Sequence, residues 1–148
     1  MGYGRWEMTW LGTMLTAVLI ELLNAFYLKL WSYNLVWSAL AFLPFSNFGM
    51  FGFIGWTVLW ISTLSITYNL SKKFFIHSFL IWILAWFLNG FIAETINAKL
   101  AVGMWIHYGI TALYPMPILD FSPIALVGWV AIGAISWVII FVLNKLYS

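Results

Sequence analysis

The chain has 148 residues, of which 65% are hydrophobic and 21% aromatic, while only 7% carry a charge. A water-soluble domain of this length cannot bury so much apolar surface, so the composition excludes a soluble enzyme and indicates an integral membrane protein. A net charge of only +2 and the absence of cysteine exclude a basic nucleic-acid-binding surface and thiol chemistry.

Four apolar runs have the length of a transmembrane helix, which needs about 20 mostly apolar residues. They cover residues 8–30, 49–70, 74–97 and 123–143. The last run begins at Pro123, which suits the first turn of a helix because its missing N–H would have no partner there. We therefore predict an all-α integral membrane protein of four transmembrane helices, forming a single domain over residues 1–148.

The positions of Lys and Arg predict how these helices are oriented. One set of helix ends carries four of them: Arg5, Lys72, Lys73 and Lys145. The opposite ends carry two, Lys29 and Lys99. Because the more basic side usually faces the cytoplasm, we predict a cell-membrane protein with both termini cytoplasmic and with the connections 32–48 and 103–122 outside.

The two outer connections are apolar and aromatic rather than polar. Residues 35–43 and 110–114 are too short to span a membrane but suit re-entrant or interfacial segments. Their aromatic residues fit the membrane interface, where a ring is buried while its N–H or O–H stays hydrated: Trp31, Tyr33, Trp37, Trp105, Tyr108 and Tyr114. We expect an interfacial aromatic turn in which His107 is hydrogen-bonded.

The second half of the chain repeats the first at a spacing of 73 residues. Identical residues at this spacing include Glu21/Glu94, Asn24/Asn97, Pro44/Pro117, Gly55/Gly128 and Trp56/Trp129. We predict two tandem two-helix repeats, residues 1–71 and 74–148. Since each repeat contains two crossings, the copies have the same orientation and are expected to be related by a pseudo-twofold axis along the membrane normal.

Glu21 and Glu94 are the residues that are most costly to place in a membrane. A carboxylate near the centre of a transmembrane helix costs about 2.5–3.5 kcal/mol and usually faces protein or water. Asn24 and Asn97 follow three residues later, on the same helix faces. We expect these four side chains to form one polar intramembrane cluster.

The role of this cluster stays open among several alternatives. The groups could hydrogen-bond between helices or against a partner subunit. One glutamate could instead be catalytic, as a general acid or base. A metal or ion site could form where Glu21, Glu94, His107 and Asp120 meet at the outer surface, or the cluster could line an ion or proton pathway. Metal-ligand spacings, phosphate-binding loops and haem-type histidine pairs are absent from the sequence, so we expect neither a metal nor a cofactor.

Two charged residues near the second carboxylate also have predicted roles. Lys99 is expected to extend toward the membrane interface or to neutralise Glu94. Asp120 precedes the last predicted helix, so we expect it to cap that helix.

Small residues recur on the second and fourth predicted helices, at Gly49, Gly52 and Gly55 and at Gly128 and Gly133. Such spacing allows helices to approach closely. Internal packing is favoured over a face for binding a partner.

The second half of the chain resembles a known family. Glu94-x-x-Asn97, then Gly103-Met-Trp105-Ile-His-Tyr108, then Pro117, Pro123 and Trp129 resemble the carotenoid-biosynthesis membrane superfamily, which includes lycopene-cyclase domains and carotenoid hydratases. The likeness covers residues 94–129 and its echo at 21–56. It implies a duplicated, Trp-rich scaffold in which Glu94 or Glu21 protonates a long isoprenoid.

Two functional hypotheses follow. The chain is short and has few chemically active groups, which favours a small, non-catalytic integral subunit that supports a larger membrane complex. Its expected partners are membrane lipids and other integral subunits, and not nucleic acid. The alternative is an acid/base membrane enzyme acting on a long apolar isoprenoid, in which aromatic rings stabilise a carbocation.

Overall fold

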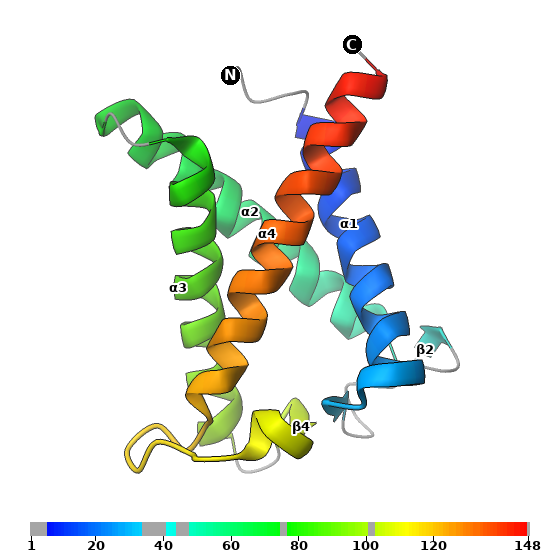
Figure 1. Ribbon diagram of the computed structural model, residues 1–148, viewed down its shortest axis with the longest axis vertical. Helices are drawn as coiled ribbons and strands as arrows, with labels where there is room; N and C mark the ends of the chain where they lie inside the picture. The colour runs from blue at the N-terminus through cyan, green and yellow to red at the C-terminus, as the bar shows by residue number, and fades with distance from the viewer. Residues whose placement is uncertain (1–5, 34–40, 44–47, 75–76, 101–102, 148) are drawn as a thin grey trace.

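The computed structural model describes residues 6–33, 41–43, 48–74, 77–100 and 103–147. The described chain is mostly helical and contains four long helices (Figure 1): α1 (Trp6–Leu23), α2 (Met50–Lys73), α3 (Ser78–Lys99) and α4 (Pro123–Leu146). This agrees with the predicted helical class. Three residues with predicted roles lie outside the described residues: Arg5, Trp37 and Pro44.

Three helical segments among the described residues are long and apolar enough to cross a membrane: Trp6–Leu28, Ser78–Lys99 and Pro123–Leu146. The first joins α1 to a short π-helix, η1 (Asn24–Leu28). The other long helix, α2, has 24 residues and buries the hydroxyl groups of Thr63 and Thr67 completely. A crossing by α2 and the cytoplasmic position of the termini stay predictions.

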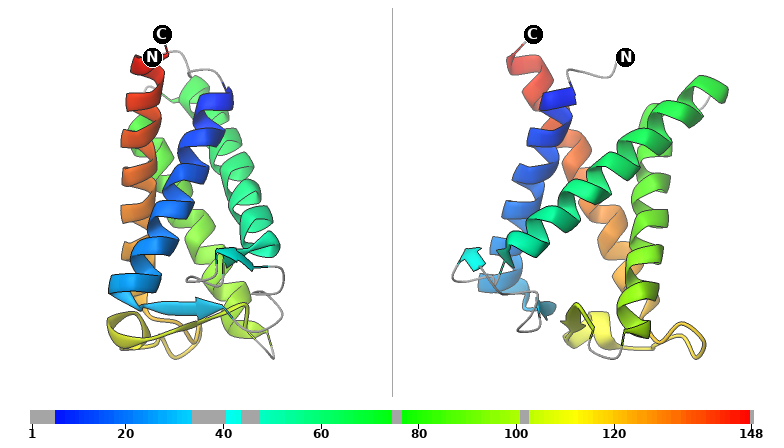
Figure 2. Two further views of the ribbon diagram at one scale, coloured as in Figure 1. Left: turned by 90° about the vertical axis from the view of Figure 1, so that its right-hand side faces the viewer. Right: turned by 180° about the vertical axis from the view of Figure 1, so that it is seen from behind.

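Helices from the two halves of the chain cross and pack against each other. The start of α1, the end of α4 and the adjoining ends of α2 and α3 lie at one end, and the short strands lie at the other (Figure 1). From the strand end, α2 runs obliquely from beside α1 toward α3, whereas α4 runs from beside α3 toward α1 (Figure 2). As a result α1 packs on α4, and α2 packs on α3.

Tryptophans fill the core where these helices cross. The buried cluster comprises Met14, Ala17, Trp56, Trp82, Trp86 and Ile140. Two glycines let helices α3 and α4 approach: Gly90 lies against the Trp129 side chain and Gly133 against that of Trp86. Among the glycines that the sequence singled out, Gly133 thus packs internally as predicted, whereas a Cβ added at Gly55 or Gly128 would meet no atom within 4 Å.

The strand end contains two small antiparallel sheets. The strand β1 (Trp31–Tyr33) pairs with β4 (Trp105–His107), and β2 (Ala41–Leu43) pairs with β3 (Phe48–Gly49). The connection after β4 continues as a single 3-10 turn, η2 (Gly109–Ala112). It is thus an extended segment with one short turn rather than a re-entrant helix. Local backbone hydrogen bonds satisfy part of this connection, such as Met116 N–H to the Phe121 carbonyl and Asp120 N–H to the Met116 carbonyl.

The register of β1 and β4 is symmetric about one residue pair. Trp31 lies opposite His107, Ser32 opposite Ile106, and Tyr33 opposite Trp105. A twofold axis between Ser32 and Ile106 would generate these three pairs, by exchanging Trp31 with Trp105 and Tyr33 with His107. The residues exchanged in this way are 74 positions apart, one more than the predicted repeat spacing of 73, and the repeat itself remains a prediction.

Lys99 and Asp120, the charged residues beside the strand end, make contacts that differ from those predicted. Lys99 donates a hydrogen bond to Asp120 Oδ2 at 2.6 Å and another to the Ile118 carbonyl, so it is engaged away from Glu94. The predicted capping role of Asp120 is wrong, because the Ser122 hydroxyl accepts the hydrogen bond from the Ile124 N–H at the start of α4. Ser122 lies directly before the first helical residue, where a side-chain oxygen can reach that N–H.

Candidate functional site

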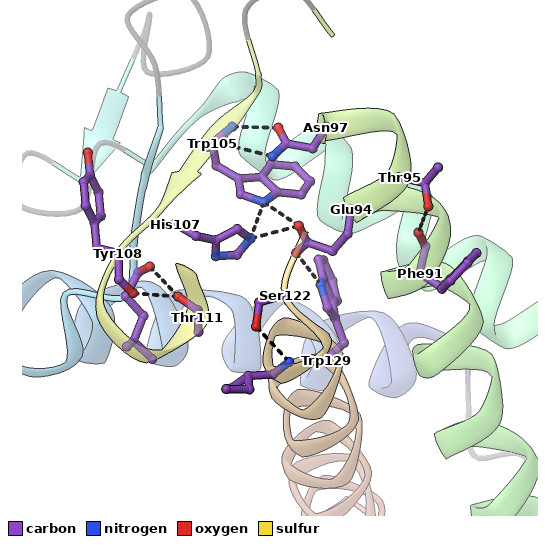
Figure 3. Close-up of polar contacts among 12 residues, drawn as sticks. Phe91, Glu94, Thr95, Asn97, Trp105, His107, Tyr108, Thr111, Ser122 and Trp129 are labelled. Carbon is purple, nitrogen blue, oxygen red and sulfur yellow. Dashed lines mark hydrogen bonds and ion pairs between the residues drawn. The ribbon is translucent and has the colours of Figure 1, made fainter. Parts of the chain in front are cut away.

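Glu94 lies near the end of α3 and is only 1% exposed. Its Oε1 accepts a hydrogen bond from Trp129 Nε1 at 2.9 Å. Its Oε2 accepts one from Trp105 Nε1 at 3.3 Å and lies 2.8 Å from His107 Nε2 (Figure 3). Both oxygens are therefore engaged by side chains of the protein, which offsets the cost of burying a carboxylate.

Glu94 Oε2 and His107 Nε2 are joined by a hydrogen bond. At 2.8 Å, either the imidazole N–H donates to the carboxylate, or a carboxylic acid O–H donates to the imidazole nitrogen. Trp105 Nε1 lies 3.2 Å from the same nitrogen, and the other ring nitrogen, Nδ1, is buried and has no hydrogen-bond partner among the described residues. The hydrogen-bonded pair thus lies directly beside the Trp105 indole.

Asn97 binds the backbone rather than the carboxylate. Its Nδ2 donates to the Trp105 carbonyl at 2.9 Å, and its Oδ1 accepts from the Trp105 N–H at 3.0 Å (Figure 3). Asn24 makes the same pair of bonds to Trp31, at 2.8 and 3.3 Å. A side-chain amide offers one donor group and one acceptor, as a peptide does, so each Asn closes one edge of the β1–β4 sheet as a further strand would.

Replacing Asn97 by Ala tests this role. The substitution leaves the N–H and C=O of Trp105 without their partner, so we expect the free energy of unfolding to fall by about 1–3 kcal/mol. Reversible unfolding in mixed detergent micelles measures the change. Thr95→Ala is the matched control, since its hydroxyl only bonds the Phe91 carbonyl within α3. Equal stability of the Asn97→Ala and Thr95→Ala variants would contradict the role of Asn97 in closing one edge of the β1–β4 sheet.

Glu21 forms the corresponding site at the end of α1 and is also 1% exposed. Tyr33 donates a hydrogen bond to its Oε1 at 2.5 Å, and the side chains of Trp31 and Trp56 approach the same carboxylate. Burial, reinforced by the neighbouring Glu21, raises the pKa of the Tyr33 phenol well above its usual value. Tyr33 therefore remains a protonated donor at neutral pH.

The two sites correspond residue by residue. Tyr33 occupies the place of His107, and Trp31 that of Trp105. Trp56 likewise takes the place of Trp129. The two carboxylates lie in separate hydrogen-bonded sets, and Trp56 and Trp129 connect these sets with ring centroids 6.5 Å apart. Sequence reasoning did not assign these two indoles to the site, although their identity at the repeat spacing was the signal that marked them.

The indoles form a continuous cluster beside both carboxylates. Trp105, Trp129, Trp86 and Trp56 follow one another with centroid distances of 6.4, 6.2 and 5.7 Å. Aromatic faces of this kind can stabilise a nearby positive charge. The described residues contain no group of three or more His, Cys, Asp or Glu that could hold a metal ion.

Comparison of the chain with protein-family models, with curated proteins and with solved structures finds no match.

Proposed function

We propose that this protein is a small integral membrane subunit that supports a larger membrane complex by helix packing and does not itself catalyse a reaction. The observation that carries the proposal is the complete use of the Glu94 carboxylate by Trp129, Trp105 and His107. A carboxylate whose two oxygens bind internal donors serves to hold α3, α4 and β4 together. The most costly intramembrane group thus has a structural role.

The outer surface of α4 is suited to packing against a helix of a partner subunit. Val127 and Val138 are largely exposed on this helix, and a Cβ added at Gly128 would meet no other atom within 4 Å. A glycine near exposed β-branched side chains lets a second helix approach closely and gain dispersion energy. Gly55 on α2 is equally open. These faces fit membrane lipids and helices of other integral subunits.

The mass of the native particle tests the subunit hypothesis. We expect protein extracted in mild detergent at its natural level to elute with other polypeptides in a particle larger than one chain. Size-exclusion chromatography with light scattering measures this mass. A homogeneous monomer surrounded only by detergent and lipid would contradict the proposal.

Gly128→Leu is expected to lower the recovery of partner polypeptides about tenfold, because the added side chain would occupy the open space beside Gly128 into which a partner helix would pack. Co-purification from membranes measures this recovery. Leu15→Phe is the control, because it adds bulk to the exposed face of α1. Partner recovery that is unchanged by Gly128→Leu would argue against α4 as the packing face.

A second candidate function is acid/base catalysis on a long apolar isoprenoid. It is favoured by the pairing of each carboxylate with a side chain that carries a proton, His107 or Tyr33, beside rings that could stabilise a cation. In this scheme Glu94 or Glu21 protonates a double bond. Turnover of a polyene should then fall at least 100-fold in Glu21→Gln or Glu94→Gln but not in Lys99→Gln. Full activity of both carboxamide variants would exclude this function.

A further inference from the structure

The connection between α3 and α4 carries an exposed apolar segment, residues 113–118, whose sequence is Leu-Tyr-Pro-Met-Pro-Ile. Three of its large side chains are strongly exposed: Leu113 at 49%, Tyr114 at 79% and Ile118 at 83%. Isolated apolar residues are common on any protein surface, but a run of neighbouring ones marks a surface that contacts a membrane or another molecule. This segment therefore needs a partner.

Hydrogen bonds and a buried ring hold the segment in place. The Met116 N–H donates to the Phe121 carbonyl at 3.0 Å, and the Asp120 N–H donates to the Met116 carbonyl at 2.8 Å. The Phe121 side chain is 4% exposed and packs edge-on against the ring of Phe91 on α3, with centroids 5.9 Å apart. The closed loop is thus anchored to α3 at Phe121, while Ile118 stays outside the protein.

Lys99, at the end of α3, binds the same loop and removes its charge. Its ammonium group donates to the Ile118 carbonyl at 3.0 Å and to Asp120 Oδ2 at 2.6 Å. Asp120 is the only charged residue in the sequence between Lys99 and Pro123. The ion pair therefore leaves the loop without a net charge. A neutral loop with apolar side chains gains free energy at the boundary between lipid headgroups and acyl chains.

The loop lies where the exposed apolar face of α3 ends. This helix is long and apolar enough to cross a membrane, and residues four apart lie on one face of a helix. Residues 113–122 extend sideways past the end of α3 (Figure 1, and the right-hand view of Figure 2). The exposed apolar side chains of α3 recur every fourth residue and reach the start of this connection: Leu80, Leu84, Leu88, Ile92, Ile96 and Leu100.

We infer that residues 113–118 form a loop that inserts into the lipid interface beside α3. Ile118 enters the upper acyl chains, and the Tyr114 ring lies at the headgroups, where its hydroxyl stays hydrated. The Lys99–Asp120 ion pair positions this loop. Continuity with the apolar face of α3 and the lack of net charge favour phospholipid over a protein as the partner. The inference does not depend on the proposed subunit role.

A fluorescent label on the loop tests its contact with lipid. The chain has no cysteine, so Ile118→Cys gives the full-length protein a single site for a nitrobenzoxadiazole label. In phosphatidylcholine vesicles, we expect acyl-chain nitroxides near the headgroup to quench this label about twofold more than nitroxides near the chain end. Leu113→Cys, which retains Ile118, should show the same order.

Two other positions provide the matched references. Leu88→Cys places the label at an exposed site midway along α3, where the deeper nitroxide should quench more. Lys73→Cys places it at the exposed, basic end of α2, where aqueous iodide should quench most. An Ile118 label that responds to iodide as the Lys73 label does would overturn the inference. Protection of the Ile118 label from both iodide and lipid nitroxides would also overturn it, because a protein contact would then cover the loop.

Asp120→Asn tests the role of the ion pair. Asparagine tolerates the left-handed backbone at this position, φ 59°. The Lys99 ammonium would then be without its counter-ion but still bonded to the Ile118 carbonyl, so it should draw the tip of the loop toward water. We expect quenching of the Ile118 label by the shallow nitroxide to fall about twofold, with the Leu88 label unchanged. Equal quenching of the Ile118 label with and without Asp120→Asn would overturn the positioning role of the ion pair.

Discussion

Glu94→Gln is expected to lower the free energy of unfolding by about 2–5 kcal/mol, the range found when one partner of a buried charged hydrogen-bond set is replaced. Three side chains converge on this carboxylate, and the two indoles can only donate. An amide offers one acceptor oxygen, so its NH₂ group must face either Trp129 or the pair formed by Trp105 and His107. The loss is measured by reversible unfolding in mixed micelles.

Two further variants identify the cause of this loss. Trp129→Phe removes one opposing donor, so Glu94→Gln should cost less in that background than in the wild type. Asp120→Asn changes a carboxylate at the same end of the molecule whose ion pair with Lys99 is more than half exposed. That substitution should change stability by less than about 1 kcal/mol. Similar effects of Glu94→Gln and Asp120→Asn would show that the buried hydrogen bonds contribute little.

The helices and the carboxylates could be predicted from the sequence, because each depends on a local property. An apolar run of about 20 residues has few alternatives to a helix in a membrane. A glutamate inside such a run must find donors within the protein or reach water. These constraints identified Glu21 and Glu94 without knowledge of their neighbours. They do not identify the donors, which come from other helices and strands.

The strand pair could not be predicted in this way. Each strand has only three residues, and its pairing joins Trp31 to a residue 76 positions later, His107. Local sequence favoured an interfacial segment because the surrounding residues are apolar and aromatic. The deciding contacts are made by Asn24 and Asn97, whose amides bind backbone groups seven and eight residues ahead. An asparagine near a helix end does not specify such a contact by its position alone.

Each Asn is separated from the Trp that it binds by seven positions in the first half and by eight in the second. This spacing shows where the two halves differ. The Asn residues are 73 positions apart, whereas the Trp residues that they bind are 74 apart. In the first half the helix continues as η1 and ends at Lys29 with a left-handed backbone, φ 49°. In the second half α3 continues to Lys99. The additional residue is therefore accommodated in the turn, while each Asn keeps both bonds to its Trp.

Gly90→Ala is expected to destabilise the protein by about 1–3 kcal/mol, the usual cost of overpacking, although alanine favours an exposed helix by about 1 kcal/mol. The added Cβ would lie 2.3 Å from Cγ and 2.7 Å from Cβ of Trp129. The indole cannot retreat freely, because its Nε1 is bonded to Glu94. Relief of the clash therefore separates α3 from α4 or breaks that bond. Unfolding in mixed micelles measures the loss.

Gly128→Ala is the matched substitution, one residue before Trp129 on the same helix. Its Cβ would meet nothing within 4 Å, so we expect only the gain in helix propensity, about 0.5–1 kcal/mol of added stability. The two glycines thus predict effects of opposite sign from the same chemical change. If Gly90→Ala proved as stable as Gly128→Ala, the close contact that holds the Trp129 indole against Glu94 would be refuted.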